Sequence, residues 1–155
     1  MRYGSTVPAP VTTPIGLVLT KTAKTASRAF DLSLAEAGGS QPIWQILMSL
    51  KTARRANQRE LAADVGIQGA TLTHHLNGME TAGLVTRRRD PDNRRVHLVE
   101  ITDEGEALFH RLAKAAIAHD KRLRAGFSEA ELHLLAALLT RLGDNASTGP
   151  TGQSV

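Results

Sequence analysis

The sequence contains no cysteine among its 155 residues, which excludes disulfide bonds, thiolate metal ligands, cysteine nucleophiles and thiol-based redox sensing. Aromatic residues make up only 3% of the chain, so the core must be built from aliphatic side chains. No apolar run approaches the roughly 20 residues that a membrane-spanning helix needs. The first residues lack a charged segment followed by an apolar one. We therefore expect no signal peptide, no membrane partner and a cytoplasmic location.

The composition is that of a globular domain, with 41% hydrophobic and 22% charged residues. Its net charge of +4 lies entirely in the middle third of the chain, because residues 51–99 contain nine cationic residues and five acids. Five of these cations fall within residues 85–95, and all five are arginine, the side chain suited to forked phosphate contacts and minor-groove insertion. A basic patch between neutral flanks indicates a polyanionic partner, and the alternative is a solvated basic loop.

Apolar residues at spacings of three and four predict a helix from Pro14 to Ala37 and another that follows Ser40. The glycines at 38–39 separate them, and a basic connection is expected to begin at Lys51. The second half of the chain predicts a long helix from Thr102 to about residue 124.

A leucine-rich helix is expected after a capping box at Ser128, in which Glu131 stands three residues later. This helix should stop at Gly143. The tail beyond it shows no apolar period.

Residues 57–83 carry the pattern of a helix-turn-helix. Asn57 with Glu60 predicts a helix start, Gly66 allows a turn, and a second short helix is expected from about Gly69 to Ala82. The apolar positions of that second helix leave on its outer face residues suited to contacts with base edges and phosphates, most of them with short hydrogen-bonding side chains: Gln68, Gly69, Thr71, Thr73, His74 and Asn77. The alternative is an ordinary helical hairpin of a bundle.

Over residues 85–101 the helical spacing gives way to the two-residue alternation of β-strands, which predicts a hairpin. Its tip, RRDPDNRR, is rich in turn residues and arginine. A helical bundle does not account for an arginine-tipped hairpin directly after a helix-turn-helix. The order of elements therefore predicts a mainly α fold, a winged helix-turn-helix with six helices and a β-hairpin wing.

The runs QPIWQILMSL, QRELAADVGI and ATLTHHLNGMETAGLVTRRRDPDNRRVHLVEITDEG resemble the MarR family of bacterial transcription regulators. The wing carries the most specific part of the resemblance, which covers about residues 14–142. The family pattern GLV-x-R-x-x-D-P is matched here in register by Gly83, Leu84, Val85, Arg87, Asp90 and Pro91, followed by Arg95, Val99, Ile101, Thr102 and Gly105. The family's wing aspartate, which braces the tip arginine, is matched here by Asn93, and Asp92 beside it is the other candidate for bracing the wing.

The resemblance implies a homodimer that presents two winged helices to a pseudo-palindromic site on double-stranded DNA. The expected division is a flexible arm over 1–13, dimerisation helices within 14–39 and 103–143, the DNA-binding domain over 40–102 and a disordered tail over 144–155. Helix 69–82 would enter the major groove and Arg95 the minor groove. Backbone contacts are expected from Gln58, Arg59, Arg87 and Arg94. The apolar first and last helices, which have more apolar surface than one small domain covers, agree with a dimer.

Members of the family often bind small anionic or phenolic compounds between the dimerisation helices and the winged domain. A ligand-responsive repressor is therefore the expected function, and the candidate effector pocket comprises Thr20, Lys24, Arg28, Trp44 and His75. The alternatives for these residues are surface cations, a core tryptophan and a half-buried histidine. No histidine spacing typical of zinc is present, so no metal or other cofactor is expected.

Other classes of function remain as alternatives. A winged-helix protein-interaction module without DNA binding is one, and a constitutive regulator without a ligand response is another. An enzyme is not expected, because no nucleophile–base pair, phosphate loop or metal motif is present. RNA binding is disfavoured, since the stacking aromatics that single strands favour are missing.

Overall fold

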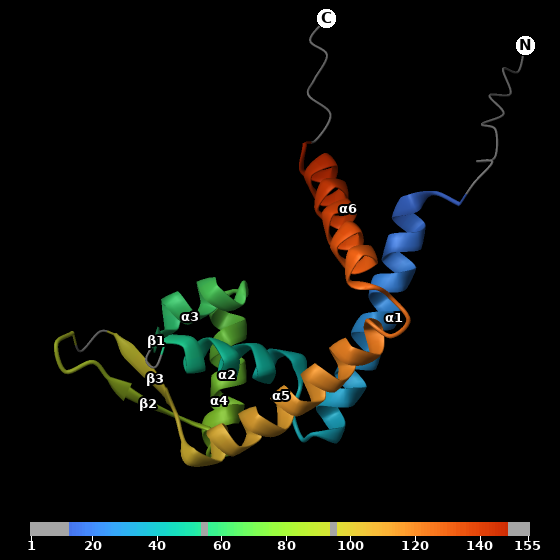
Figure 1. The fold of residues 1–155 in the computed structure, drawn as a ribbon. Helices are drawn as coiled ribbons and strands as arrows, with labels where there is room; N and C mark the ends of the chain where they lie inside the picture. Colours follow the sequence, from blue (N-terminus) through green and yellow to red (C-terminus); the bar gives the residue numbers. More distant parts are fainter. Residues whose placement is uncertain (1–12, 54–55, 94–95, 149–155) are drawn as a thin grey trace, which may run out of the picture. The chain divides into compact units, whose positions relative to one another are not determined.

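The computed structural model describes residues 13–53, 56–93 and 96–148. The chain divides into two compact units, residues 1–119 and 120–155, which are described separately below. Within the described residues there are six helices and three short strands, which makes the fold mainly α as the sequence predicts (Figure 1). None of the six helices in these residues combines the length and the apolar character that a membrane span requires.

The first unit begins with α1 (Ile15–Glu36) and α2 (Gln41–Ala53). Gly38, at a φ of 91°, makes the turn between them in a conformation that glycine adopts without strain. The expected start of a basic connection at Lys51 is wrong, because α2 continues through Ala53. The Lys51 ammonium bonds the Glu106 carboxylate at 2.8 Å, and a cation near a helix C-terminus is favourable.

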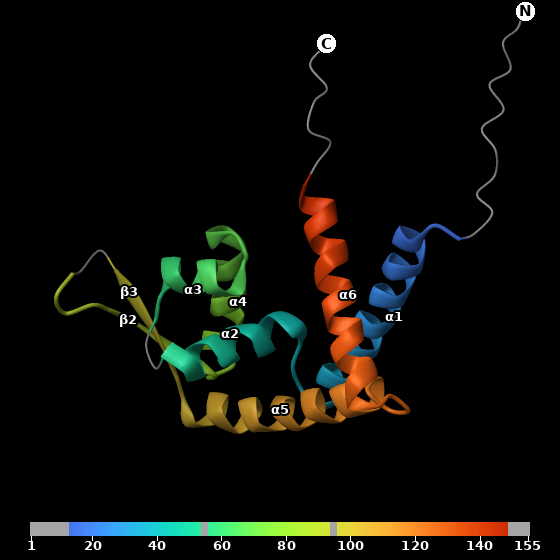
Figure 2. The ribbon, with the colours of Figure 1, turned by 45° about the horizontal axis from the view of Figure 1, so that its top comes forward.

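The helix-turn-helix consists of α3 (Gln58–Val65) and α4 (Gly69–Thr81), and both pack with α2 at the base of the hairpin (Figure 2). The core is aliphatic, as the low aromatic content predicts. Its largest fully buried side chains are Leu34, Ile46, Leu47, Leu50, Leu61, Leu72, Leu76, Met79, Val85, Val99 and Leu112. Trp44 and Phe109 stack at its edge with ring centroids 5.4 Å apart.

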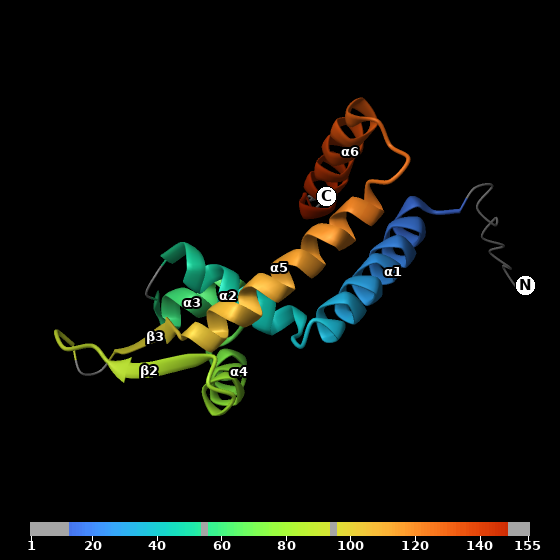
Figure 3. The same cartoon turned by 60° about the horizontal axis from the view of Figure 1, so that its bottom comes forward.

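The sheet has the strand order β1 (Ala56–Asn57), β3 (His97–Ile101), β2 (Val85–Arg89), with antiparallel pairing throughout. In the hairpin, Arg87 lies opposite Val99 and Arg89 opposite His97. β2 and β3 run side by side and project away from α4, forming the expected wing (Figure 3). The strand β1 is an addition to the predicted fold, since two residues show no period.

Thr102 joins the wing to α5 (Asp103–Leu123), the expected long helix. Its hydroxyl donates to the Gly83 carbonyl at 2.6 Å and accepts from the Gly105 amide at 3.1 Å. The threonine thus caps α5 and ties the helix to the start of the hairpin.

The second unit contains α6 (Glu129–Ser147), which begins at the predicted capping box of Ser128 and Glu131. Its expected stop at Gly143 is wrong, because the helix continues to Ser147. A glycine costs a helix about 1 kcal/mol relative to alanine, which weakens but does not end it. The expected disordered tail from residue 144 is therefore wrong for its first four residues, which are helical.

Candidate nucleic-acid interface

The second helix of the helix-turn-helix, α4, is positioned by the short helix before it. Asn57 accepts a hydrogen bond from the Glu60 amide at 2.9 Å, and the Glu60 carboxylate bonds back to the Asn57 amide, so the predicted capping box is present. Gly66 ends α3 in the left-handed conformation, at a φ of 75°. Leu72, Leu76 and Met79 then bury one face of α4, which leaves its other face to solvent.

The residues predicted to contact DNA here come from α4 and from its N-cap, Gln68. The structure places all six of them as exposed residues: Gln68, Gly69, Thr71, Thr73, His74 and Asn77. Gln58 is half-buried and Arg59 exposed at the start of α3. The helix-turn-helix therefore presents polar side chains on one side and its core contacts on the other.

The wing adds cations beside this face. Arg88 donates to the Glu100 carboxylate across the hairpin at 2.6 Å, and this hydrogen bond raises the pKa of Arg88 above its usual value. Arg89 is exposed on β2. Arg94 and Arg95, predicted as backbone and minor-groove contacts, lie outside the described residues, so their roles stay predictions.

The turn of the wing is organised by Asp90. Its carboxylate accepts from the Asp92 amide at 2.9 Å, and its own amide donates to the Val96 carbonyl at 2.9 Å. The Val96 amide closes the turn by bonding to the Asn93 carbonyl at 2.8 Å. Bracing of a tip arginine by Asp92 or Asn93 stays a prediction, whereas the backbone contacts that shape this turn centre on Asp90.

Arg87 connects the wing to α4. Its guanidinium donates to the Asn77 side-chain oxygen at 2.7 Å and to the Glu80 carboxylate at 3.0 Å from Nε. The Arg87 side chain is only 21% exposed. The hydrogen bond from Arg87 also holds the pKa of Glu80 below its usual value. Glu80 is not among the residues predicted from the sequence, although its place three residues after Asn77 puts both on one helix face.

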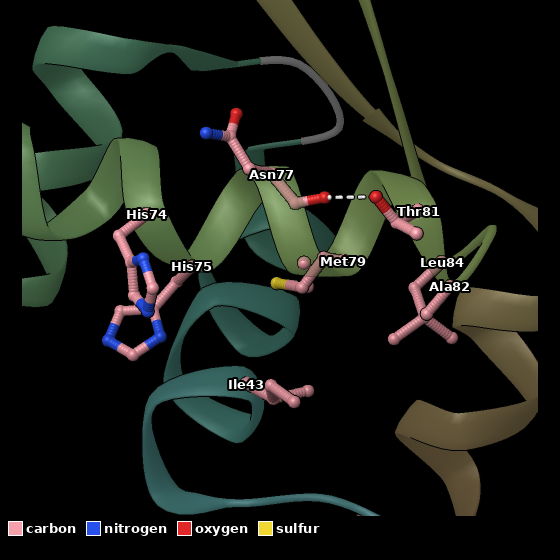
Figure 4. Close-up of a pocket in the computed structure, with 9 residues that line it drawn as sticks. Ile43, His74, His75, Asn77, Met79, Thr81, Ala82 and Leu84 are labelled. Carbon is pink, nitrogen blue, oxygen red and sulfur yellow. Dashed lines mark hydrogen bonds between the residues drawn. The ribbon is translucent and has the colours of Figure 1, made fainter.

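A cavity of about 540 Å³ lies beside α4, against the start of α2, and includes part of the exposed face of α4 in its lining. It is lined by Ile43, His74, His75, Asn77, Gly78, Met79, Thr81, Ala82 and Leu84. Figure 4 shows the two imidazoles together at one end, with ring centroids 5.7 Å apart, and Ile43 facing α4 from α2. The cavity thus combines apolar walls with two nitrogen-bearing rings.

The predicted effector residues are only partly brought together. His75 is half-buried and lines this cavity. Trp44 stacks on Phe109 and is not among the lining residues, although its neighbour Ile43 is. Thr20, Lys24 and Arg28 are exposed on α1 and do not line the cavity. Ile43, Met79 and Leu84 take the wall positions instead, and sequence reasoning missed them because they come from separate elements.

Comparison with known proteins identifies the family of this arrangement. The model of the MarR family matches residues 40–97, from the start of α2 into β3. The uncharacterized HTH-type transcriptional regulator YdgJ of Bacillus subtilis (strain 168) is 34% identical over 108 residues, which are 70% of this chain and 66% of that protein. The HTH-type transcriptional regulator PecS of Dickeya dadantii (strain 3937) is 36% identical over 49% of this chain and 46% of its own length. The matched regions thus span less than two thirds of both relatives.

Solved structures share the fold over most of the chain. The PcaV transcriptional regulator of Streptomyces coelicolor superposes with a TM-score of 0.80 at 22% identity, covering 87% of this chain and 98% of that one. BpsR of Bordetella bronchiseptica, whose DNA binding is regulated by 6-hydroxynicotinic acid, has a TM-score of 0.76 at 20% identity over 89% and 99% of the chains. A mutant MarR from E. coli complexed with operator DNA has a TM-score of 0.74 at 21% identity over 83% and 93%.

The family match falls on the winged helix-turn-helix, and the structural likeness to these three solved structures covers 83–89% of the chain. The chain belongs to the MarR family of winged helix-turn-helix transcriptional regulators.

Proposed function

We propose that the protein is a sequence-specific DNA-binding transcriptional regulator that acts in the cytoplasm as a repressor. The observation that carries this proposal is the outer face of α4, where polar side chains lie beside an arginine-bearing wing joined to the same helix through Arg87. In this arrangement α4 enters the major groove, and Thr71, Thr73 and His74 contact base edges or phosphates. Gln58 and Arg59 contact the DNA backbone from the start of α3.

The proposed DNA-binding form is a homodimer on a pseudo-palindromic site. α1 exposes a cluster of apolar side chains, Ile15, Leu17, Val18 and Leu19, at 41–61% exposure. α6 exposes Leu134, Leu135, Leu138 and Leu139 at 39–59%. Apolar surface of this extent favours coverage by a second copy, and a twofold dimer would offer two recognition helices to one duplex.

A small anionic or phenolic compound is the proposed effector, and the cavity beside α4 is its proposed site. His74 and His75 offer hydrogen-bond donors at one end, while Ile43, Met79 and Leu84 supply the apolar wall. Because His74 and Asn77 belong both to this cavity and to the outer polar set, an occupant would alter the side chains that face DNA. The alternative is a constitutive regulator whose cavity has no physiological ligand.

DNA binding is tested by gel shifts with the DNA upstream of the protein's own gene, against random DNA of equal length, at several salt concentrations. We expect tight, specific binding that weakens steeply with salt, because each phosphate contact releases a counterion. Equal affinity for the two DNAs would contradict a sequence-specific regulator and favour the protein-interaction module.

The effector proposal is tested by adding hydroxybenzoic and nicotinic acids to the specific complex. Release of the DNA should be weaker in His75→Leu, because the variant removes one donor from the cavity. His110→Leu is the matched control, since His110 is an exposed histidine on α5 and does not line the cavity. Unchanged DNA binding with every compound would favour the constitutive regulator.

A further inference from the structure

The contact between Arg87 and Asn77 fixes which way the Asn77 amide faces. A guanidinium has five N–H donors and no acceptor, so only the amide oxygen of Asn77 can face it. The observed contact has this sense, since Arg87 donates to Oδ1 at 2.7 Å. The amide nitrogen, which carries two donors, is therefore the free end of an exposed side chain.

Glu80 keeps Arg87 in the position that makes this contact. Its Oε2 atom accepts from both Nε and one terminal nitrogen of Arg87, so the flat guanidinium is held by its edge against α4. Glu80 and Asn77 are three residues apart, one turn along the same face, and a single arginine bridges them. The guanidinium of Arg87 thus makes its hydrogen bonds within the protein, where the Glu80 carboxylate holds it in place.

We propose that Glu80 and Arg87 are positioning residues that set the base specificity of Asn77, and that Asn77 offers DNA a donor and no acceptor. This inference rests on the proposed DNA-binding function. A donor at this position selects base edges that carry acceptors in the major groove, guanine O6 and N7, thymine O4 or adenine N7, and disfavours the N4 amino group of cytosine. Arg87 then acts through Asn77 rather than on a phosphate.

The pair of Arg88 and Glu100 offers a matched control on the same hairpin. Arg88 donates to Glu100 at 2.6 Å and so joins β2 to β3, whereas Arg87 joins β2 to α4. Glu80→Gln and Glu100→Gln remove one negative charge each from the winged domain. They therefore change the overall attraction to DNA alike, and only the first loosens the hold on Asn77.

The test is selection of binding sites from a random double-stranded DNA library, followed by affinities for every single-base variant of the selected site. Glu80→Gln should reduce the preference at one base pair in each half-site by about fivefold, the scale of one groove hydrogen bond. Asn77→Ala should reduce the preference at the same pair. Glu100→Gln should leave the pattern of preferences unchanged while strengthening binding to all sites.

Asn77→Asp serves as a second variant, because aspartate can still accept from Arg87 but offers only acceptors outward. It should shift the preference at that pair toward a base with an amino donor, cytosine or adenine. An unchanged preference pattern in Glu80→Gln, or a loss that is uniform over all bases as for a phosphate contact, would overturn the inference. If the wild-type protein selects no sequence at all, the proposed function fails instead.

Discussion

Gly105 at the start of α5 packs directly against the carbonyl oxygen of Leu84, which precedes the wing. A Cβ atom on Gly105 would lie 2.1 Å from that oxygen and 2.8 Å from the Ile101 side chain. The same oxygen accepts the Thr102 amide at 3.1 Å, so it cannot move away without breaking a hydrogen bond. The glycine therefore lets the two ends of the hairpin and the first turn of α5 meet.

Gly105→Ala should consequently lower the free energy of unfolding, by about 1–3 kcal/mol or more, because backbone must shift to admit the methyl group. Urea unfolding followed by circular dichroism measures the change. Gly78→Ala is the control: a Cβ at Gly78 would meet nothing within 4 Å, and alanine within a helix should stabilise by about 0.5–1 kcal/mol. Equal stability of Gly105→Ala and the wild type would show that the contact is looser than described.

The cap of α3 is the basis of a second prediction. Asn57→Ala should lower the free energy of unfolding by about 1 kcal/mol, because the Glu60 amide loses its acceptor. Asn57→Ser retains an N-cap acceptor and should stay within a few tenths of a kcal/mol of the wild type. Thermal and urea unfolding of the two variants compare them directly. A loss shared by both would assign the effect to the strand β1 and not to the cap.

The ion pair of Glu80 and Arg87 predicts a pH dependence. The hydrogen bond from Arg87 lowers the pKa of Glu80 below its ordinary value of 4.5, so the native protein binds fewer protons there than the unfolded chain does. The contribution of the pair to stability is therefore fully present above pH 4.5 and is lost as the pH falls through the native pKa. Carboxyl ¹³C titration by NMR measures this pKa in the folded protein.

Two variants distinguish the effect of Arg87 on the pKa of Glu80 from the effect of the other positive charges in the wing. Arg87→Gln should raise the pKa of Glu80 toward its ordinary value, because the guanidinium donor is gone. Arg88→Gln removes a neighbouring charge of the same sign but leaves the contact intact, and should affect Glu80 much less. A Glu80 that titrates at or above 4.5 in the native protein would contradict the observed pairing.

The elements that sequence could predict are those with a period or a cap of their own. The outer face of α4 follows from the spacing of Leu72, Leu76 and Met79, and the start of α3 follows from Asn57 and Glu60. These signals are local, since a helix places every third or fourth residue on one side whatever it packs against. The recognition helix and the wing were accordingly found at their observed positions.

The features that escaped prediction depend on contacts between separate elements. β1 exists because Ala56 and Asn57 pair with Val99 and Leu98. A strand of two residues is too short to show an alternating pattern in the sequence. The docking of β2 against α4 brings Arg87 to Asn77 and Glu80, contacts that the sequence did not predict, and its expected contact with the DNA backbone stays a prediction. The cavity likewise takes Ile43 from another helix. The spacing of residues along the sequence does not predict contacts between separate elements.

The apolar face of α6 supports a last prediction, on the homodimer. Leu138→Lys should halve the mass measured by sedimentation at micromolar concentration, since a buried ammonium in an apolar interface is costly. A monomer binds one half-site only and lacks the gain in affinity from two linked DNA-binding domains. Its affinity for the selected site should therefore fall by about 100-fold or more. His133→Lys places a cation on a different side of the same helix and should change neither quantity much. If the Leu138→Lys protein sediments like the wild type and binds DNA equally well, the dimer interface does not include this face of α6.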